Sequence, residues 1–226
     1  MRIMDITQDQ EERLKELMGV FLLENKKLNL SAYRTEEQCW HGNVLDSVVG
    51  IQKGEFGKGM RVLDCGTGGG FPLLPLAILF PIAEFTGLDA TKKKIDAVQR
   101  MIAKLGLRNA ELIIGRAEEM GREQMFREQF DVVLSRAVAP LSTLLEYMSP
   151  FVRVGGTLIC WKSLSIEEEL VESIQARMQL KTRLTGRTEY VLPGDWGKRQ
   201  LLFFQKTAAL TNEFPRAVGI PKKEPL

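Results

Sequence analysis

The stretch Arg61-Val-Leu-Asp-Cys-Gly-Thr-Gly-Gly-Gly-Phe-Pro72 decides the fold. Its first five residues form a short, mainly apolar run that stops at glycine, as a buried strand of a parallel sheet does. Gly66, Gly68 and Gly70 follow at every second position, and Pro72 stands where the first turn of a helix begins. Glycines let the backbone turn tightly and let a ligand approach it. The stretch therefore predicts a strand, a ligand-binding turn and a helix, the start of a nucleotide-binding βαβ unit.

The order of the glycines indicates which ligand the turn holds. In the dinucleotide fingerprint G-x-G-x-x-G the third glycine allows close helix–strand packing, but Phe71 stands at that position. The pattern is instead Asp64-x-Gly66-x-Gly68-x-Gly70, which resembles motif I of the class I methyltransferases that use S-adenosylmethionine (SAM). An acid at the end of the first strand suits SAM, which carries an amino group and a sulfonium. The alternative is a structural turn in another α/β protein, because a lone glycine motif is weak evidence.

Length and composition fit one α/β domain with an extension. The chain has 226 residues, of which 44% are hydrophobic and 27% charged, and it contains no apolar run long enough to span a membrane. The N-terminus is too polar for a signal peptide. Cys39, Cys65 and Cys160 lack metal-binding spacing, so we expect reduced thiols and no metal. These features predict a cytoplasmic protein without a membrane segment.

Charge is unevenly distributed along the chain. The net charge is only +2, but residues 175–226 contain ten Lys and Arg against four Asp and Glu. A basic C-terminal face suits contact with phosphates, and a solvated surface explains the charge equally well.

The first part of the chain predicts a helical extension. Capping boxes at Thr7–Gln10 and Thr35–Gln38 predict helices over about 9–26 and 35–53. A stretch rich in glycine and charge, 54–59, then leads to the first strand. We predict a helical extension over 1–58, a SAM-binding domain over 59–210 and a basic tail over 211–226.

Strands and helices alternate through the middle of the chain. Strands are expected at 84–88, 110–114, 130–135 and 157–162, with a helix over 91–105 that Gly106 ends. Ser165-Ile-Glu-Glu168 predicts a capped helix, and a closing hairpin is expected from 190–192 and 200–204. This order predicts an α/β fold with a doubly wound, mainly parallel, Rossmann-like sheet.

Charged residues gather where these strands end. Asp64, Asp89, Glu118, Arg136 and Lys162 all fall at or just after the carboxyl end of a predicted strand, where ligands bind in such sheets. Asp89 comes about 20 residues after the glycines, the position of an acid that holds ribose hydroxyls. In class I methyltransferases, alanine and an acid after the third strand, here Ala117 and Glu118, hold the adenine. Glu118 could otherwise complement a helix dipole.

The sequence lacks the groups that several methyl-transfer reactions require. Ser135-Arg-Ala-Val-Ala-Pro140 stands in place of the Asn/Asp-Pro-Pro-Tyr/Phe motif of amino-group enzymes. Carbon-5 pyrimidine enzymes need a nucleophilic cysteine near the site, but no cysteine stands directly after the fourth strand, and Cys160 lies inside the fifth. His41, the only histidine, is a poor candidate for a general base. Guanine N7 carries a free lone pair, so its methylation would need no base.

Several motifs together resemble the RsmG (GidB) family, bacterial methyltransferases of guanine N7 in 16S ribosomal RNA. The resemblance covers nearly the whole chain, and its motifs are Asn29-Leu-Ser31, Leu45-Asp-Ser47, Asp64 to Pro72 with Pro75, Phe130-Asp131, Ser135-Arg-Ala137, Lys162 and the tail from Phe214 to Leu226. It implies a SAM-dependent enzyme acting on the small ribosomal subunit or its precursor. We expect a monomer, because no assembly motif is visible.

The resemblance also implies roles for individual residues. Gly66, Phe71, Ala117, Glu118 and Arg136 would line the cofactor, together with Asp64, Gly68, Gly70 and Asp89 from the fold. Arg136 and Lys162 would grip RNA phosphate or the guanine O6. The alternative for Arg136 is an ion pair with Asp64 or Glu118. Asp46 would cap the extension over the site, or only end a helix.

The chain departs from the family at three places. Gly42-Asn43 replaces the family's Arg-His, with His41 displaced by two positions; Pro72-Leu73 replaces Pro-Gly; and Lys162-Ser163 replaces Lys-Gly. Two other functions therefore stay open: a SAM methyltransferase of another substrate, and a ribosome-binding factor that holds SAM without catalysis. Trp40 and Trp196 would stack on an extruded base or pack, and Trp161 belongs to the core.

Overall fold

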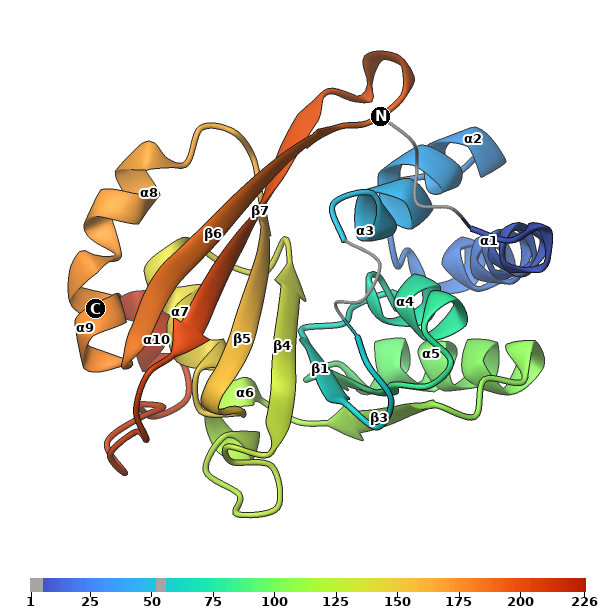
Figure 1. The fold of residues 1–226 in the computed structure, drawn as a ribbon. Helices are drawn as coiled ribbons and strands as arrows, with labels where there is room; N and C mark the ends of the chain where they lie inside the picture. Colours follow the sequence, from blue (N-terminus) through green and yellow to red (C-terminus); the bar gives the residue numbers. More distant parts are fainter. Residues whose placement is uncertain (1–5, 52–55) are drawn as a thin grey trace.

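The computed structural model describes residues 6–51 and 56–226. It has a twisted seven-stranded sheet covered by helices on both faces (Figure 1). The strand order is β3-β2-β1-β4-β5-β7-β6, and β1 to β5 run parallel while β7 is antiparallel to both of its neighbours. The strands are β1 Arg61–Cys65, β2 Glu84–Asp89, β3 Ala110–Ile114, β4 Phe130–Arg136, β5 Val152–Lys162, β6 Thr182–Val191 and β7 Lys198–Lys206.

The point where the strand order reverses lies between β1 and β4. Strand β1 is buried along almost its whole length, and Val62 pairs with Val132 of β4 and with Phe85 of β2. An apolar strand of this kind suits the centre of a sheet that is covered on both faces. The crevice at the carboxyl ends of β1 and β4 is therefore the expected ligand site.

The helices divide between the two faces (Figure 1). Helices α1 Gln8–Leu28, α4 Leu73–Leu79 and α5 Lys92–Leu105 pack together on one face, and α7 Leu141–Met148 lies on the other with α9 Ile174–Gln179 and α10 Ile220–Lys223. The short helices α6 Ala117–Met120 and α8 Glu167–Glu172 also contact α7. Gly106 ends α5 as predicted, in the left-handed conformation.

The N-terminal extension shares the core of the sheet domain. Thr7 makes the predicted capping box with Gln10, and the buried side chains Leu17 and Phe21 of α1 belong to the same hydrophobic cluster as Val62 of β1. The second predicted helix is not one regular helix. It is α2 Glu36–Cys39, a π-helical segment Trp40–Leu45 and α3 Asp46–Val48. Its predicted end at Lys53 and the first part of the 54–59 stretch lie outside the described residues.

The closing hairpin is longer than predicted. Strands β6 and β7 pair from Thr182 with Lys206 to Val191 with Lys198, and a 3₁₀ turn, η2 Gly194–Trp196, forms the tip. The Trp196 ring packs on the rings of Tyr33 and His41, each with a centroid distance of 5.5 Å. The hairpin tip therefore contacts the N-terminal extension.

Three predictions about the ends of helices and strands were wrong. Pro72 stands one residue before α4 rather than inside it. Strand β5 begins at Val152, five residues before its predicted start. Gly155, with φ +80°, lies inside the strand, whereas the prediction placed this glycine in a turn before it. Ser165 caps no helix, since α8 follows Ile166 and has no side-chain cap.

Neither a membrane helix nor a metal cluster is found in the part of the chain that the structure describes. None of its helices combines the length and the apolar character needed to cross a bilayer. Within the same residues, no group of three or more His, Cys, Asp or Glu side chains is placed to hold a metal ion.

The end of β7 carries a fully buried cation. The Lys206 ammonium donates to Glu128 Oε1 at 3.0 Å and to the carbonyl oxygens of Ser149 at 2.7 Å and Val152 at 3.3 Å. Burial lowers the pKa of Lys206, and the Glu128 carboxylate opposes this shift. Glu128 also accepts from the Leu210 amide at 3.1 Å, so one carboxylate joins β7 to the chain that follows it.

Replacing Glu128 with alanine should lower the free energy of unfolding by about 3 kcal/mol, because it leaves a buried ammonium without its counter-charge. Urea denaturation at neutral pH measures this effect. The exposed Glu123→Ala in the same loop is the control and should change stability by less than about 0.5 kcal/mol. Equal stabilities of the two variants would contradict a structural role for the Lys206–Glu128 pair.

Candidate active site

Three cavities lie in a row along the carboxyl edge of the parallel strands. The first, of about 190 Å³, lies over β1, β2 and β3; the second, of about 400 Å³, lies over the glycine loop; and the third, of about 260 Å³, lies over β4 and β5. Gly66, Asp89 and Val138 line both the first and the second, and Arg136 and Ala137 line both the second and the third. Neighbouring cavities therefore share walls.

The glycine loop forms the wall between the first two cavities. Gly66 has φ +86°, and its amide donates to the carbonyl oxygen of Leu88 at 2.8 Å. A Cβ on Gly66 would lie 2.6 Å from Val138 Cγ2, so glycine is required there. Gly70 has another role, because a Cβ there would lie 2.7 Å from Leu74 Cδ1. Gly70 lets the loop pack on α4 and lines neither cavity.

Asp89, at the end of β2, is held rigidly and faces both cavities. Its Oδ1 accepts from the Thr91 amide at 2.8 Å, and its Oδ2 accepts from the Gly68 amide at 3.1 Å. Two backbone donors fix the carboxylate plane and leave lone pairs for further donors. This geometry suits a carboxylate that accepts hydrogen bonds from a pair of ribose hydroxyls.

The far end of the first cavity is built by α6. Ala117 and Glu118 both line it, and the Glu118 side chain is buried, with 5% of the residue exposed. Glu118 Oε1 accepts a hydrogen bond from the Gly219 amide at 3.0 Å. Cys65 and Tyr147 add apolar surface to this cavity. A flat aromatic base with an amino group fits such walls.

Asp64 lies beneath the glycine loop and lines none of the three cavities. It is 1% exposed, and its Oδ2 accepts from the amide of Leu73, the first residue of α4, at 3.2 Å. Burial raises the pKa of Asp64 to about 6. The structure therefore places Asp64 as a support of the loop, whereas the sequence suggests a residue facing the ligand.

Arg136, at the end of β4, is bound by the N-terminal extension. Its Nη1 donates to Asp46 Oδ2 at 2.9 Å and to the Gly42 carbonyl at 3.1 Å, and its Nη2 lies 3.4 Å from Asn43 Oδ1. The guanidinium carbon lies 6.0 Å from the centre of the Phe71 ring. Asp46 is thus the ion-pair partner of Arg136, in place of the Asp64 or Glu118 that the sequence suggested.

Two further side chains hold Asp46 in place. The Tyr190 hydroxyl donates to Asp46 Oδ1 at 2.8 Å, and Trp161 Nε1 donates to the Asp46 carbonyl at 2.7 Å. Burial, together with the Asp46 charge, raises the pKa of Tyr190, so the phenol stays protonated. The sequence did not identify Tyr190, because nothing local in the β6 strand indicates a partner 144 residues away.

Gly42, the first residue of the Gly42-Asn43 departure, is closely packed. A Cβ on Gly42 would lie 2.3 Å from Cε2 of the Tyr33 ring. The ring of Tyr33 therefore occupies the space that a side chain at position 42 would need. Both Gly42 and Asn43 nevertheless contact Arg136, one through its backbone and one through its side chain.

Lys162, at the end of β5, lines the third cavity. Its ammonium donates to the Ala139 carbonyl at 3.0 Å and to Glu169 Oε2 at 2.7 Å. Arg199 of β7 lines the same cavity, although no motif in the sequence pointed to this residue. Together with Arg136, these side chains give the third cavity three cations, of which Arg136 is paired with Asp46 and Lys162 with Glu169.

Other candidate groups are not placed for catalysis. His41 lines none of the three cavities, and its ring stacks on that of Trp196 at an interplanar angle of 9°. The thiols of Cys39, Cys65 and Cys160 are free and buried, and burial raises the pKa of each. They therefore remain neutral and poor nucleophiles.

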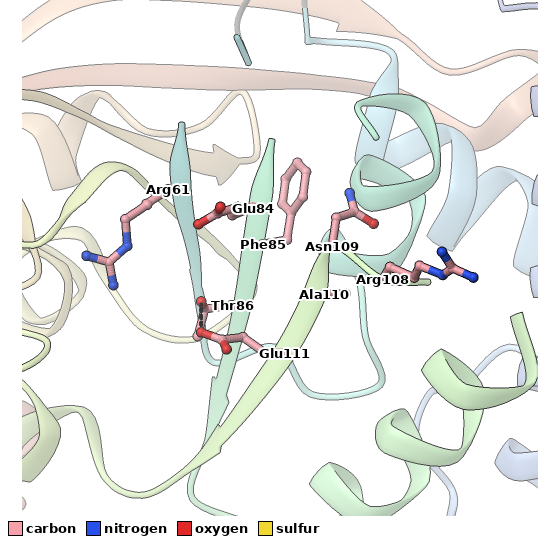
Figure 2. Close-up of a pocket in the computed structure, with 8 residues that line it drawn as sticks. All are labelled: Arg61, Glu84, Phe85, Thr86, Arg108, Asn109, Ala110 and Glu111. Carbon is pink, nitrogen blue, oxygen red and sulfur yellow. Dashed lines mark hydrogen bonds between the residues drawn. The ribbon is translucent and has the colours of Figure 1, made fainter. Parts of the chain in front are cut away.

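A fourth cavity, of about 230 Å³, opens at the opposite edge of the sheet, at the amino ends of β1, β2 and β3 (Figure 2). Several of its polar groups are already hydrogen-bonded within the protein. The Thr86 hydroxyl donates to Glu111 Oε1 at 3.0 Å, and Asn109 Nδ2 donates to three carbonyl oxygens of the 77–83 segment. None of the predicted site residues reaches this cavity.

Comparisons with known proteins identify the family of the chain. The family model GidB, described as rRNA small subunit methyltransferase G, matches residues 10–190. Proteins named ribosomal RNA small subunit methyltransferase G are 38% identical in Thermoanaerobacter pseudethanolicus and 39% identical in Caldanaerobacter subterraneus. Each match covers 95% of this chain and 90% of the relative.

The chain belongs to this family.

Solved structures support the fold. Fibrillarin from Aeropyrum pernix, solved with bound S-adenosyl-L-methionine, has a TM-score of 0.56 at 16% identity over 70% of this chain and 72% of its own. Fibrillarin from Methanococcus jannaschii has the same TM-score at 13% identity, over 73% and 74%. The predicted family and class I methyltransferase fold are confirmed. The chain is accordingly a SAM-dependent methyltransferase of small-subunit ribosomal RNA.

Asp64 should make stability depend on pH in the free protein. Its pKa of about 6 lies above the value of about 3.9 for an exposed aspartate, so the folded state binds more protons between these values. The contribution of Asp64 to the free energy of unfolding therefore falls as the pH rises from about 4 to about 6. Asp64→Asn keeps an acceptor for the Leu73 amide and cannot ionise.

The stability of Asp64→Asn relative to wild type should rise by about 2 kcal/mol between about pH 4.5 and about pH 7, measured by urea denaturation without SAM. Asp96→Asn, which removes a half-exposed carboxylate paired with Lys92 on α5, serves as the control for the loss of a carboxylate as such. A flat difference for Asp64→Asn would show that the buried carboxyl does not titrate there.

Proposed function

We propose that the enzyme transfers the methyl group of SAM to N7 of a guanine in 16S ribosomal RNA. The observation that carries this proposal is the third cavity, which is cationic and has no free base among the described residues that line it. Asp46 is its only carboxylate, and both of its oxygens are engaged, Oδ1 by Tyr190 and Oδ2 by Arg136.

The residues of the first two cavities fit SAM by their donors and acceptors. Asp89 would accept from the ribose hydroxyls, and Glu118 and Ala117 would bind the adenine. Gly66 and Gly68 give the backbone close access to the second cavity, where the amino-acid part would lie beside Phe71 and Arg136. Bound SAM supplies a methyl group on a sulfonium. Asp64 and Gly70 would act on the cofactor only through the loop that they support.

The chemistry of N7 explains why a base is not needed. The N7 lone pair would form the new bond to the methyl carbon as the sulfur–methyl bond breaks in line with it, and the neutral thioether S-adenosylhomocysteine would leave. The positive charge would pass to the guanine, so no proton has to leave. The protein then only has to hold the guanine at the correct distance and angle. The guanidinium of Arg136, the ammonium of Lys162 and the guanidinium of Arg199 would donate to O6 or to phosphate.

Another substrate is the second candidate, and Asn43 is the observation that favours it. Asn43 replaces a histidine of the family pattern and lies 3.4 Å from Arg136 Nη2. A changed contact at the residue that grips the substrate is where a changed specificity would begin. A ribosome-binding role without methyl transfer would leave the cationic third cavity without a purpose.

The remaining predictions belong to this proposal. We infer that the chain works as a monomer in the cytoplasm, where ribosomes are built, and without a metal ion. We also infer a division into an extension, 1–58, a SAM-binding domain, 59–210, and a tail, 211–226. The extension would close the third cavity through Asp46, and the tail would pack against the domain.

The reaction can be tested directly with labelled SAM and small subunits or 16S RNA that lack the modification. Borohydride reduction and aniline treatment then cleave the RNA at any 7-methylguanosine. A single new cleavage is the expected result. SAM binding with no label in RNA would overturn the rRNA assignment, and label without aniline cleavage would overturn the N7 assignment.

Arg136→Ala should lower kcat by about 100-fold, because it removes a preorganised charged donor from the third cavity. Arg136→Lys keeps the charge but loses the forked contact, and should recover only part of the activity. The measurement is methyl incorporation at saturating SAM, with the SAM Kd determined in parallel.

The control for Arg136 is Arg183→Ala, which removes an exposed arginine of β6 that binds Gln205. It should retain full kcat. Normal activity of Arg136→Ala would exclude Arg136 from the reaction, and a loss confined to SAM affinity would make it a cofactor-binding residue only.

A further inference from the structure

The C-terminal segment, residues 207–226, is packed against the element that builds the adenine end of the first cavity. Two arginines in the loop after α6 bind its backbone. Arg127 donates to the carbonyl oxygens of Phe214 at 2.8 Å and Thr211 at 2.9 Å, and Arg122 donates to those of Asn212 at 3.2 Å and Pro215 at 2.5 Å. Since this loop directly follows Glu118, the tail and the cavity wall are held together.

A buried ion pair fixes the middle of the tail. Arg216 Nε and Nη2 donate to the two oxygens of Glu146 at 3.0 and 2.7 Å, and the Arg216 amide adds a third hydrogen bond at 2.8 Å. Glu146, on α7, is 0% exposed. The Glu146 carboxylate also raises the pKa of Arg216. Removing either partner would leave the other charge uncompensated in the interior.

The last part of the tail contacts Glu118, which lines the first cavity. The Gly219 amide donates to Glu118 Oε1 at 3.0 Å, and the Thr143 hydroxyl donates to the Pro221 carbonyl at 2.9 Å, which holds the next turn. Gly219 has φ +85°, a conformation that other residues rarely adopt. Among the described residues Glu118 Oε2 has no hydrogen-bond donor, so only one oxygen is used by the protein.

We propose that the C-terminal tail is a positioning element of the cofactor site, in which Arg216 and Gly219 orient Glu118 for the adenine of SAM. The tail amide holds one carboxylate oxygen and thereby presents the other to the amino group of the base. This inference rests on the proposed role of Glu118. It makes SAM affinity depend on side chains of the tail that touch no ligand.

The experiment uses the full-length protein with five substitutions, of which Arg216→Lys is the conservative one. Arg216→Ala removes the anchor on Glu146, and Glu118→Gln tests the carboxylate itself. Gly219→Pro removes the amide donor and also forces the backbone away from φ +85°, because proline holds φ near about −65°. The control, Arg153→Ala, breaks a more exposed arginine–carboxylate pair, in which Arg153 Nε donates to Asp131 Oδ1 at 2.7 Å, and Arg153 lines none of the three cavities. Calorimetric SAM titration, the KM for RNA and thermal unfolding are measured for each.

We expect Arg216→Ala and Gly219→Pro to raise the Kd for SAM by about tenfold, since a hydrogen bond to a charged group is disturbed. The KM for RNA should stay within about twofold. Arg216→Lys should recover part of the affinity, and Arg153→Ala should bind SAM as wild type does. Thermal unfolding identifies any variant that has lost its fold, and the comparison then uses Arg216→Lys.

The outcomes separate this inference from the proposed function. If Glu118→Gln weakens SAM binding while Arg216→Ala and Gly219→Pro lower only the melting temperature, the tail is purely structural and the inference fails. If Glu118→Gln binds SAM normally, the assignment of Glu118 to the adenine fails. If KM for RNA rises as much as the Kd for SAM, the tail acts on the substrate instead.

Discussion

The active site depends on the ion pair between Arg136 and Asp46. This pair joins three parts of the chain that lie far apart in sequence, because Arg136 ends β4, Asp46 begins α3, and Tyr190 of β6 holds the same carboxylate. Both side chains are about 85% buried, at 14% and 15% exposure, so solvent screens their attraction only weakly. A guanidinium with three acceptors around it has a fixed direction, and this direction sets the boundary between the second and third cavities.

Most of the fold follows from local sequence. The apolar run before the glycines, the alternation of strands and helices and the capping box at Thr7 were sufficient to predict the sheet, its direction and α1. Asp89, Ala117 and Glu118 were predicted from their distance along the chain, because in a doubly wound sheet the ends of parallel strands meet at one edge, and the structure brings all three to one cavity. The proposed cofactor site therefore follows from short-range patterns.

The substrate side of the site could be predicted only in part. Arg136 and Lys162 could be predicted because they lie at the carboxyl ends of parallel strands. Tyr190 and Arg199 do not lie at such positions and were not predicted as site residues. Arg199 lines the third cavity and Tyr190 holds Asp46, and both belong to an antiparallel hairpin whose register is fixed by tertiary packing. The π-helical segment that carries Gly42 and Asn43 also has no sequence signature of its own. Sequence patterns predict where helices and strands begin and end. The contacts around the third cavity depend instead on how separate helices and strands pack against one another.

The close packing of Gly42 against the Tyr33 ring has a consequence for how these two positions can change. A side chain at position 42 would overlap the Tyr33 ring where it now lies, so an arginine of the family type requires that ring to move or to be replaced. The ring also packs on Trp196 of the hairpin tip, so its movement would disturb the contact between the hairpin and the extension. Positions 42 and 33 are therefore coupled, and the effects of substituting both on stability should not be additive.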